Sequence, residues 1–228
     1  MNLKKTTFIG ITSLATLFGL TFAAVPKTTE NIFLLQEAER QLAAMQTSTY
    51  QHITDVDEAS GRYNYDCSGF LDYSLQRVLP EAYAELPISK SKVHRPLAQD
   101  FYTLFSSKTQ ETKHWERIRK ASDLRSGDIV AWLRPQDLDS HNTGHVMLVR
   151  ANPSPNPDRP NEILIPVIDS TSAPHAKDSR SRSKGQTGLG TGSIGIVQND
   201  EGDAIAYYWR GGLSKRKEIT PIAFGRVK

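Results

Sequence analysis

Apolar residues in the first half of the chain recur at the spacing of a helix face, which limits the folds available to it. Leu34, Ala38 and Leu42 show this spacing, and Pro80 interrupts a second run. The polar stretch 47–66 between the two runs is expected to be a loop. The sequence predicts four helices, over residues 29–45, 67–79, 80–86 and 96–105.

The second half of the chain carries short apolar runs that are typical of strands. Gly127 and an Asn/Asp/Gly-rich segment at 199–203 supply turns between them, and the polar stretches 152–161 and 176–192 are expected to be loops. Helices followed by an antiparallel meander predict a single α+β domain over residues 25–228. The predicted strands cover residues 128–133, 145–151, 162–170, 193–197, 204–209 and 219–227.

The first 24 residues have the pattern of a secretory signal. Lys4 and Lys5 precede an uncharged, mostly apolar run, and small residues follow at 21–23. A retained membrane anchor is the alternative, although threonines and serines in the run weaken it. We expect cleavage, export to a bacterial periplasm or medium, and no stable membrane anchor afterwards.

Charge gives little indication of a nucleic-acid partner. The chain has 28 Lys and Arg against 25 Asp and Glu, and the removal of Lys4 and Lys5 brings the two counts closer together. A nearly neutral mature protein has no general electrostatic attraction to phosphate backbones. The basic cluster at 180–184 is interpreted as a solvated loop.

Cys67 is the single cysteine, so the chain cannot form an internal disulfide. It stands at the start of a predicted helix, where unpaired backbone N–H groups and the helix dipole favour a thiolate. Two interpretations remain open at this point. Cys67 is either a small buried core residue or a nucleophile.

A cysteine nucleophile needs an imidazole to take its proton, and His145 is the strongest of six candidates. It follows Gly144 and begins an apolar strand, which can hold the ring rigidly. Asp169, at the end of the next predicted strand, can orient that ring, and His175 is the alternative. A zinc site that uses His141 with His145 fits poorly because Gly144 interrupts the segment, so neither metal nor cofactor is expected.

Three segments, in order along the chain, resemble the motifs of NlpC-type cysteine peptidases, which are also related to CHAP amidases. They are DCSGF at 66–70, LRSGDIV at 124–130 and GHVMLV at 144–149. The resemblance implies a papain-like α+β fold in which the nucleophile begins a helix packed on an antiparallel half-barrel. It further implies a metal-free site and bacterial cell-wall peptides as substrate, usually cut between D-glutamate and a diamino acid.

Carried over by motif, Cys67 is the nucleophile, His145 the base and Asp169 the third polar residue. Asp66 and Ser68 match positions that contact the free amine of the substrate in relatives, although Asp66 can equally be a helix N-cap. A tyrosine is expected near the site, and Tyr50 is favoured because Tyr63 and Tyr65 can instead pack on the helix. The Trp-Gly-Gly sequence that precedes the cysteine in the family is missing.

These observations predict an exported, monomeric cysteine hydrolase that acts on peptide or amide bonds, as a peptidoglycan stem-peptide endopeptidase. Two alternatives stay open. One is an amidase or acyltransferase of the same superfamily, and the other is a catalytically inactive periplasmic binding module.

Overall fold

The computed structural model describes residues 30–89, 93–136 and 142–228, so the predicted signal segment 1–24 lies outside the described residues. All four predicted helices are present: α1 Asn31–Ala44, α2 Cys67–Val78, α3 Pro80–Ala84 and α4 Ala98–Ser106. Glu30 is the N-cap residue of α1 and makes no side-chain capping bond. Among the described residues, no helix is both long enough and apolar enough to cross a membrane.

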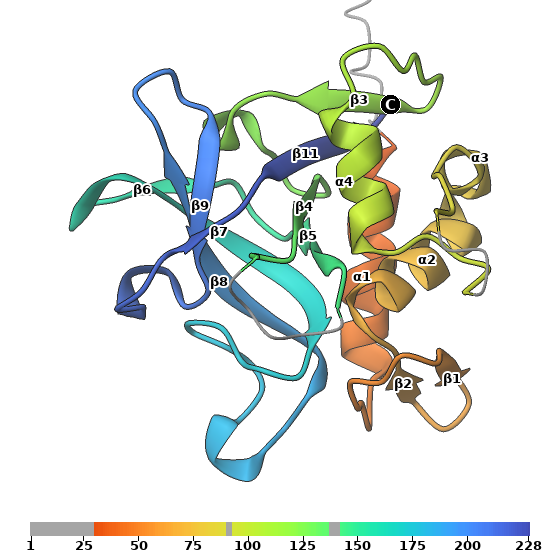
Figure 1. Ribbon diagram of the computed structural model, residues 1–228. Helices are drawn as coiled ribbons and strands as arrows, with labels where there is room; N and C mark the ends of the chain where they lie inside the picture. Colours follow the sequence, from red (N-terminus) through yellow and green to blue (C-terminus); the bar gives the residue numbers. More distant parts are fainter. Residues whose placement is uncertain (1–29, 90–92, 137–141) are drawn as a thin grey trace, which may run out of the picture.

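The helices pack on one side of a nine-stranded sheet, in which every strand pair is antiparallel (Figure 1). The strand order is β10-β9-β8-β7-β5-β4-β11-β3, with β6 paired to β7. The prediction of an α+β fold with an antiparallel sheet is therefore confirmed. The strands are β3 Trp115–Ile118, β4 Ile129–Leu133, β5 Gly144–Val149, β6 Ser154–Asn156, β7 Arg159–Thr171, β8 Gly188–Gln198, β9 Ala204–Tyr208, β10 Glu218–Ile219 and β11 Ile222–Val227.

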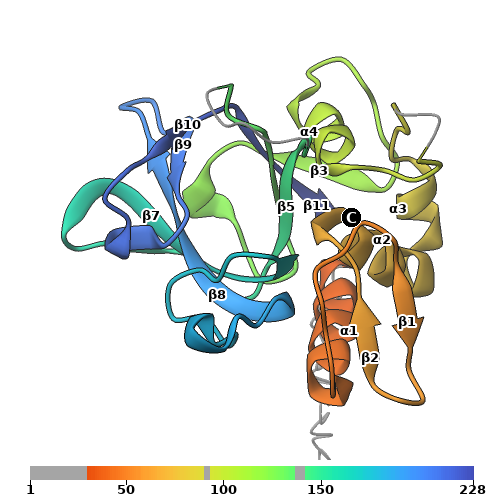
Figure 2. The ribbon, with the colours of Figure 1, turned by 60° about the horizontal axis from the view of Figure 1, so that its bottom comes forward.

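Several short strands lie where the sequence predicted loops. The stretch 47–66 contains a hairpin of β1 (Asp55–Asp57) and β2 (Arg62–Asn64), which Figure 2 shows beside α1. The stretch 152–161 contains β6 and the start of β7, and β8 begins inside the stretch 176–192. These segments are polar because they lie at sheet edges or ends, so their residues show no apolar alternation.

Alternating side chains of the sheet contribute to two separate cores. On β4, Ile129 and Ala131 pack toward the helices, whereas Val130 and Trp132 face the other side of the sheet. The same alternation continues on β5. One core therefore lies between helices and sheet, and the second lies on the face that the helices do not cover.

The sheet curls around this second core. Trp132 on β4 stacks on Tyr207 on β9, with ring centroids 4.2 Å apart, although β5, β7 and β8 lie between these strands in the sheet order. A flat sheet would hold the two strands about 19 Å apart, given roughly 4.8 Å between neighbouring strands. The curl therefore brings distant strands together, and residues that point to this concave face can converge.

The motif residue Asp128 has a structural role. Its carboxylate accepts two hydrogen bonds of 2.7 Å from Arg226 on β11 and one of 2.7 Å from the backbone N–H of Arg125. Asp128 is fully buried. The pair joins the turn before β4 to the last strand of the sheet.

We predict that Asp128→Ala destabilises the fold by about 3 kcal/mol, because it leaves the largely buried Arg226 guanidinium without its counter-charge. Urea unfolding followed by circular dichroism measures the change. The matched control is Glu39→Ala, which breaks an exposed ion pair with Arg150 and should cost at most about 1 kcal/mol. Equal losses in the two variants would contradict this role for Asp128.

Candidate active site

Cys67 is the first residue of α2, as the sequence predicted. The preceding Asp66 caps the helix, because its carboxylate accepts a 2.8 Å hydrogen bond from the backbone N–H of Gly69. Helix α2 packs against β5, and Ser170 on β7 donates a 2.6 Å hydrogen bond to the carbonyl of Tyr65. These contacts fix the start of the helix against the two strands that carry His145 and Asp169.

His145 enters the sheet directly after Gly144. Gly144 has a φ of +154°, and a Cβ atom there would lie 1.9 Å from the carbonyl oxygen of Trp132. Only glycine fits such a close approach. The next residue, Val146, donates its backbone N–H to the sulfur of Cys67 and thereby lowers the pKa of that thiol. The candidate nucleophile Cys67 therefore contacts Val146, the residue that follows the candidate base His145.

Asp169 lies beside His145 on the concave face of the sheet. Leu148 pairs with Ile168, and continuing this antiparallel register places Met147 opposite Asp169. His145 and Asp169 are thus diagonal neighbours on one face. His145 Nε2 lies 2.6 Å from Asp169 Oδ2. Because a carboxylate accepts, Nε2 carries the hydrogen, and Nδ1 is the ring atom that can accept a proton.

His175 was the alternative orienting residue, and it reaches Asp169 instead. Its Nε2 lies 2.8 Å from Asp169 Oδ2, the oxygen that also contacts His145. Its Nδ1 lies 3.0 Å from the carbonyl oxygen of Trp209, whose ring packs on both histidines. His175 therefore supports the orienting carboxylate from behind, and Asp169 is the residue in contact with His145.

Arg180 holds the other side of Asp169. Its Nη2 lies 2.9 Å from Asp169 Oδ1, and its Nη1 donates to the backbone carbonyls of Asp169 and Gly188. The interpretation of Arg180 as part of a solvated loop is wrong, since the residue is 6% exposed. A basic residue adjacent to others resembles a surface cluster in sequence, and no local pattern revealed its buried partner.

Two glycines on β8 leave space for the side chains of Arg180 and His175 beside Asp169. Gly190 pairs with Asp169, and a Cβ atom at Gly190 would lie 2.7 Å from the side chain of Arg180. A Cβ atom at Gly192 would lie 2.7 Å from His175. Glycines two apart share one face of a strand. This GxG spacing was the available sequence signal for a crowded face, and the interpretation of 176–192 as a loop overlooked it.

The electrostatics of the site favour a charged Asp169 and a neutral His145. Burial alone would raise the pKa of Asp169, but His175, Arg180 and the two imidazole hydrogen bonds hold that pKa well below its usual range. Burial lowers the pKa of His145, and its hydrogen bond to Asp169 only partly opposes this. At neutral pH the imidazole is therefore a free base.

Cys67 differs from the expectation of a resting thiolate. Burial raises the pKa of the thiol, and the carboxylates of Asp66 and Asp169 raise it further. The hydrogen bonds from the backbone N–H groups of Val146 and Ser68 lower it by less. The helix start is thus outweighed by desolvation, and the resting sulfur carries its proton.

A cleft of about 270 Å³ opens beside Cys67. Tyr50 lines it together with Asp66, Ser68 and Arg95. Tyr63 and Tyr65 are fully buried in the core, and the Tyr65 hydroxyl bonds to Gln41, so Tyr50 is the tyrosine near the nucleophile. All three predicted substrate-contacting residues therefore border the same cleft.

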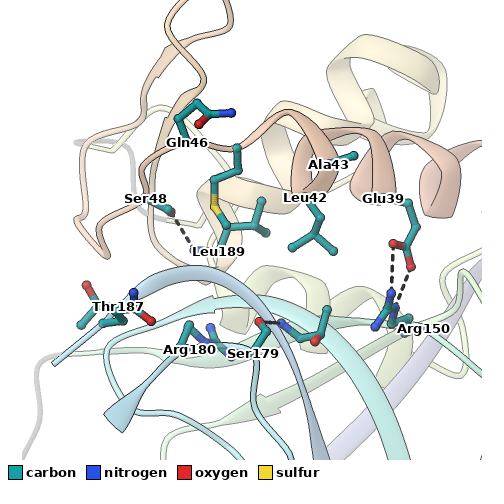
Figure 3. Close-up of a pocket in the computed structure, with 13 residues that line it drawn as sticks. Glu39, Leu42, Ala43, Gln46, Ser48, Arg150, Ser179, Arg180, Thr187 and Leu189 are labelled. Atoms are coloured by element: carbon teal, nitrogen blue, oxygen red, sulfur yellow. Dashed lines mark hydrogen bonds and ion pairs between the residues drawn. The ribbon is translucent and has the colours of Figure 1, made fainter. Parts of the chain in front are cut away.

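A second and larger cavity, of about 590 Å³, lies between the end of α1 and the start of β8 (Figure 3). Glu39 and Arg150 face each other there, 2.7 Å apart. None of the predicted site residues lines this cavity, although Arg180 borders it. Of these two cavities, only the smaller is lined by Cys67.

The side chains of His145, Asp169 and His175 also form a cluster of metal-ligand type, with ligand atoms within 4.8 Å of one another. Their geometry fits hydrogen bonding better. Tetrahedral zinc, at roughly 2.1 Å from each ligand, would separate these atoms by roughly 3.4 Å. The observed separations are 2.6 and 2.8 Å, and Arg180 already neutralises Asp169. His141, weighed earlier for zinc, lies outside the described residues.

Comparison with known proteins finds similarity to the uncharacterized protein R653 of Acanthamoeba polyphaga mimivirus. The two are 34% identical over 181 residues, which cover 71% of this chain and 77% of the viral protein. No family model matches the chain, and no solved structure matches it. Because R653 is itself uncharacterized, this similarity assigns neither a substrate nor a reaction.

We predict that the imidazole of His145 titrates with a midpoint below its ordinary value of 6.5, because burial disfavours the cation. NMR of ring-labelled histidine measures the midpoint. In Asp169→Asn, the loss of the anion should move it lower still. A ring that stays protonated at pH 7.5 would contradict this electrostatic account.

Proposed function

The chain belongs to the same protein family as R653 of the mimivirus, and from the geometry of its own site we propose that it is a cysteine hydrolase of peptide or amide bonds. One observation carries the proposal. The sulfur of Cys67 accepts a hydrogen bond from the residue after His145, and His145 is bound to the buried carboxylate of Asp169. The candidate nucleophile thus lines a cleft, and the candidate base directly follows Gly144, which lines the same cleft.

In the proposed reaction, the sulfur of Cys67 attacks the amide carbonyl while Nδ1 of His145 takes the thiol proton. Asp169 stabilises the imidazolium that forms. The proton then passes to the leaving nitrogen, and the C–N bond breaks to give a thioester on Cys67. Water attacks the thioester after giving a proton to His145, the acid is released, and that proton returns to the sulfur.

Two donors are suited to stabilise the oxyanion of the tetrahedral intermediate. The first is the backbone N–H of Cys67 at the first turn of α2, where N–H groups have no partner within the helix. The second is the hydroxyl of Tyr50, which lines the cleft. Burial, followed by the charges of Cys67 and Asp66, raises the pKa of Tyr50, so the hydroxyl remains a donor.

We propose cell-wall stem peptides as the substrate class and NlpC-type peptidases as the related enzymes. The support is the order of the three motifs, a nucleophile at a helix start, and an antiparallel sheet behind it that carries the base. This is the arrangement expected of a papain-like fold. The bond between D-glutamate and a diamino acid is the first to test, and the proposed signal at 1–24 would bring the enzyme to that substrate.

We predict that Cys67→Ala abolishes the release of fragments from purified peptidoglycan and that His145→Ala lowers the rate by about 10²–10⁴-fold. Mass spectrometry of the digest measures the fragments and identifies the bond that is cut. His114→Ala, which alters a histidine outside the cleft, is the matched control and should keep full activity.

Each outcome of this digest has a distinct meaning. Fragments cut at a muramoyl amide would indicate an amidase instead of a peptidase. Unchanged release by Cys67→Ala would refute the proposed nucleophile. Failure of the wild-type chain to cut any peptidoglycan, although its fold is intact, would favour the binding module.

We further predict that Tyr50→Phe lowers kcat by about 10²-fold while KM changes little, because the hydroxyl acts on charge that develops only in the transition state. Steady-state kinetics on the cleaved peptide separate the two constants. An increase in KM alone would assign Tyr50 to ground-state binding.

A further inference from the structure

Arg95 occupies the part of the cleft that borders the start of α2. Its Nη2 lies 2.8 Å from Asp66 Oδ2, and its Nη1 lies 2.7 Å from Ser68 Oγ. The same Nη1 contacts Asp72 Oδ2 at 3.1 Å and the backbone carbonyl of Pro96. The guanidinium is therefore held by side chains and backbone on several sides, and its side chain is only 16% exposed.

Both oxygens of Asp66 are already bonded. Oδ1 accepts from the backbone N–H of Gly69 and, at 3.3 Å, from Ser68 Oγ. Oδ2 contacts Arg95 and, at 3.1 Å, Nδ1 of His52. An incoming ammonium group would find no free lone pair in the favoured directions and would have to displace Arg95, which also holds Ser68 and Asp72.

The charges that line the cleft also disfavour the binding of a free amine beside Asp66. Among the described residues that line the cleft, Asp66 and Arg95 carry the only permanent charges, and they neutralise each other. Asp72 does not line the cleft, and its carboxyl group is itself paired with Arg95, at 3.1 Å. The one carboxylate among the described residues that line the cleft therefore already has a paired cation, which weakens the attraction of a free amine.

This arrangement conflicts with the roles carried over by resemblance, in which Asp66 and Ser68 contact the free amine of the substrate. Both residues border the cleft as predicted, but Arg95 engages both of them. This contact could not be predicted from the sequence, because Arg95 is 27 residues from Ser68 in a segment without a motif.

We propose that Arg95 determines the substrate specificity of this site. The part of the substrate that binds beside Asp66 is then an uncharged segment whose nitrogen is in an amide bond, and not a free amine. This inference rests on the proposed function. It means that the enzyme acts on bonds within longer chains, such as stem peptides still amide-linked to their glycan, and not on short peptides with a free amino terminus.

The test uses two irreversible probes that differ only in the amine, alanyl-alanine chloromethyl ketone and its N-acetyl form. Intact-mass spectrometry measures the second-order rate at which each probe alkylates Cys67. Wild-type protein should react with the acetylated probe at least as fast as with the free-amine probe. Arg95→Met should shift the ratio toward the free amine by tenfold or more, because Asp66 becomes available.

Three further variants separate specificity from structure. Arg95→Lys keeps the cation and should leave the ratio near that of wild type. Asp66→Asn in the Arg95→Met background removes the anion but preserves an N-cap residue, and should cancel the shift. Arg119→Met removes an exposed positive charge elsewhere and should change nothing.

The outcomes distinguish this inference from the proposed function. A wild-type preference for the free amine by tenfold or more would overturn the inference while leaving the thiol hydrolase intact, and this measurement does not depend on any variant folding. An unchanged ratio in folded Arg95→Met would overturn it as well. If neither probe labels Cys67 while iodoacetamide does, the proposed function fails and the inference fails with it.

Discussion

The buried carboxylate of Asp169 is the group on which the arrangement of the site depends. A charge with no exposure to water is destabilising by several kcal/mol unless partners surround it. Arg180 binds one oxygen, and His145 and His175 share the other. Because these partners come from β5 and from the segment between β7 and β8, compensation of the charge also fixes both segments against β7. The position of His145 therefore follows from the burial of an anion.

Much of the fold could be predicted because its longer elements have a strong hydrophobic period. The start of α2 at Cys67 and the strand β4 follow directly from apolar spacing and from the turn before Asp128. The short strands could not be found in this way. For example, β10 has two residues and β6 contains Pro155, so their pairing is set by neighbouring strands and not by their own sequence.

Sequence reasoning reached the residues of the site that occur in motifs, namely Cys67, His145 and Asp66. Asp169 was predicted from its position at the end of a strand. The register of β5 and β7 places Asp169 beside His145. It missed the two arginines. Arg95 contacts Asp66, 29 positions away along the chain, and Arg180 contacts Asp169, 11 positions away, while the local surroundings of both arginines in the sequence are those of ordinary surface loops.

These two arginines are paired with the two carboxylates that act on the Cys67 sulfur. Asp66 and Asp169 both raise the pKa of the Cys67 thiol, and each is paired with its own arginine. In a region of low dielectric, an unpaired carboxylate at the same distance would oppose a developing thiolate more strongly. Arg95 and Arg180 therefore lower the electrostatic barrier to ionisation without creating a resting thiolate. In the proposed reaction, the proton leaves the sulfur only when attack begins, and the neutral imidazole of His145 is the proposed acceptor.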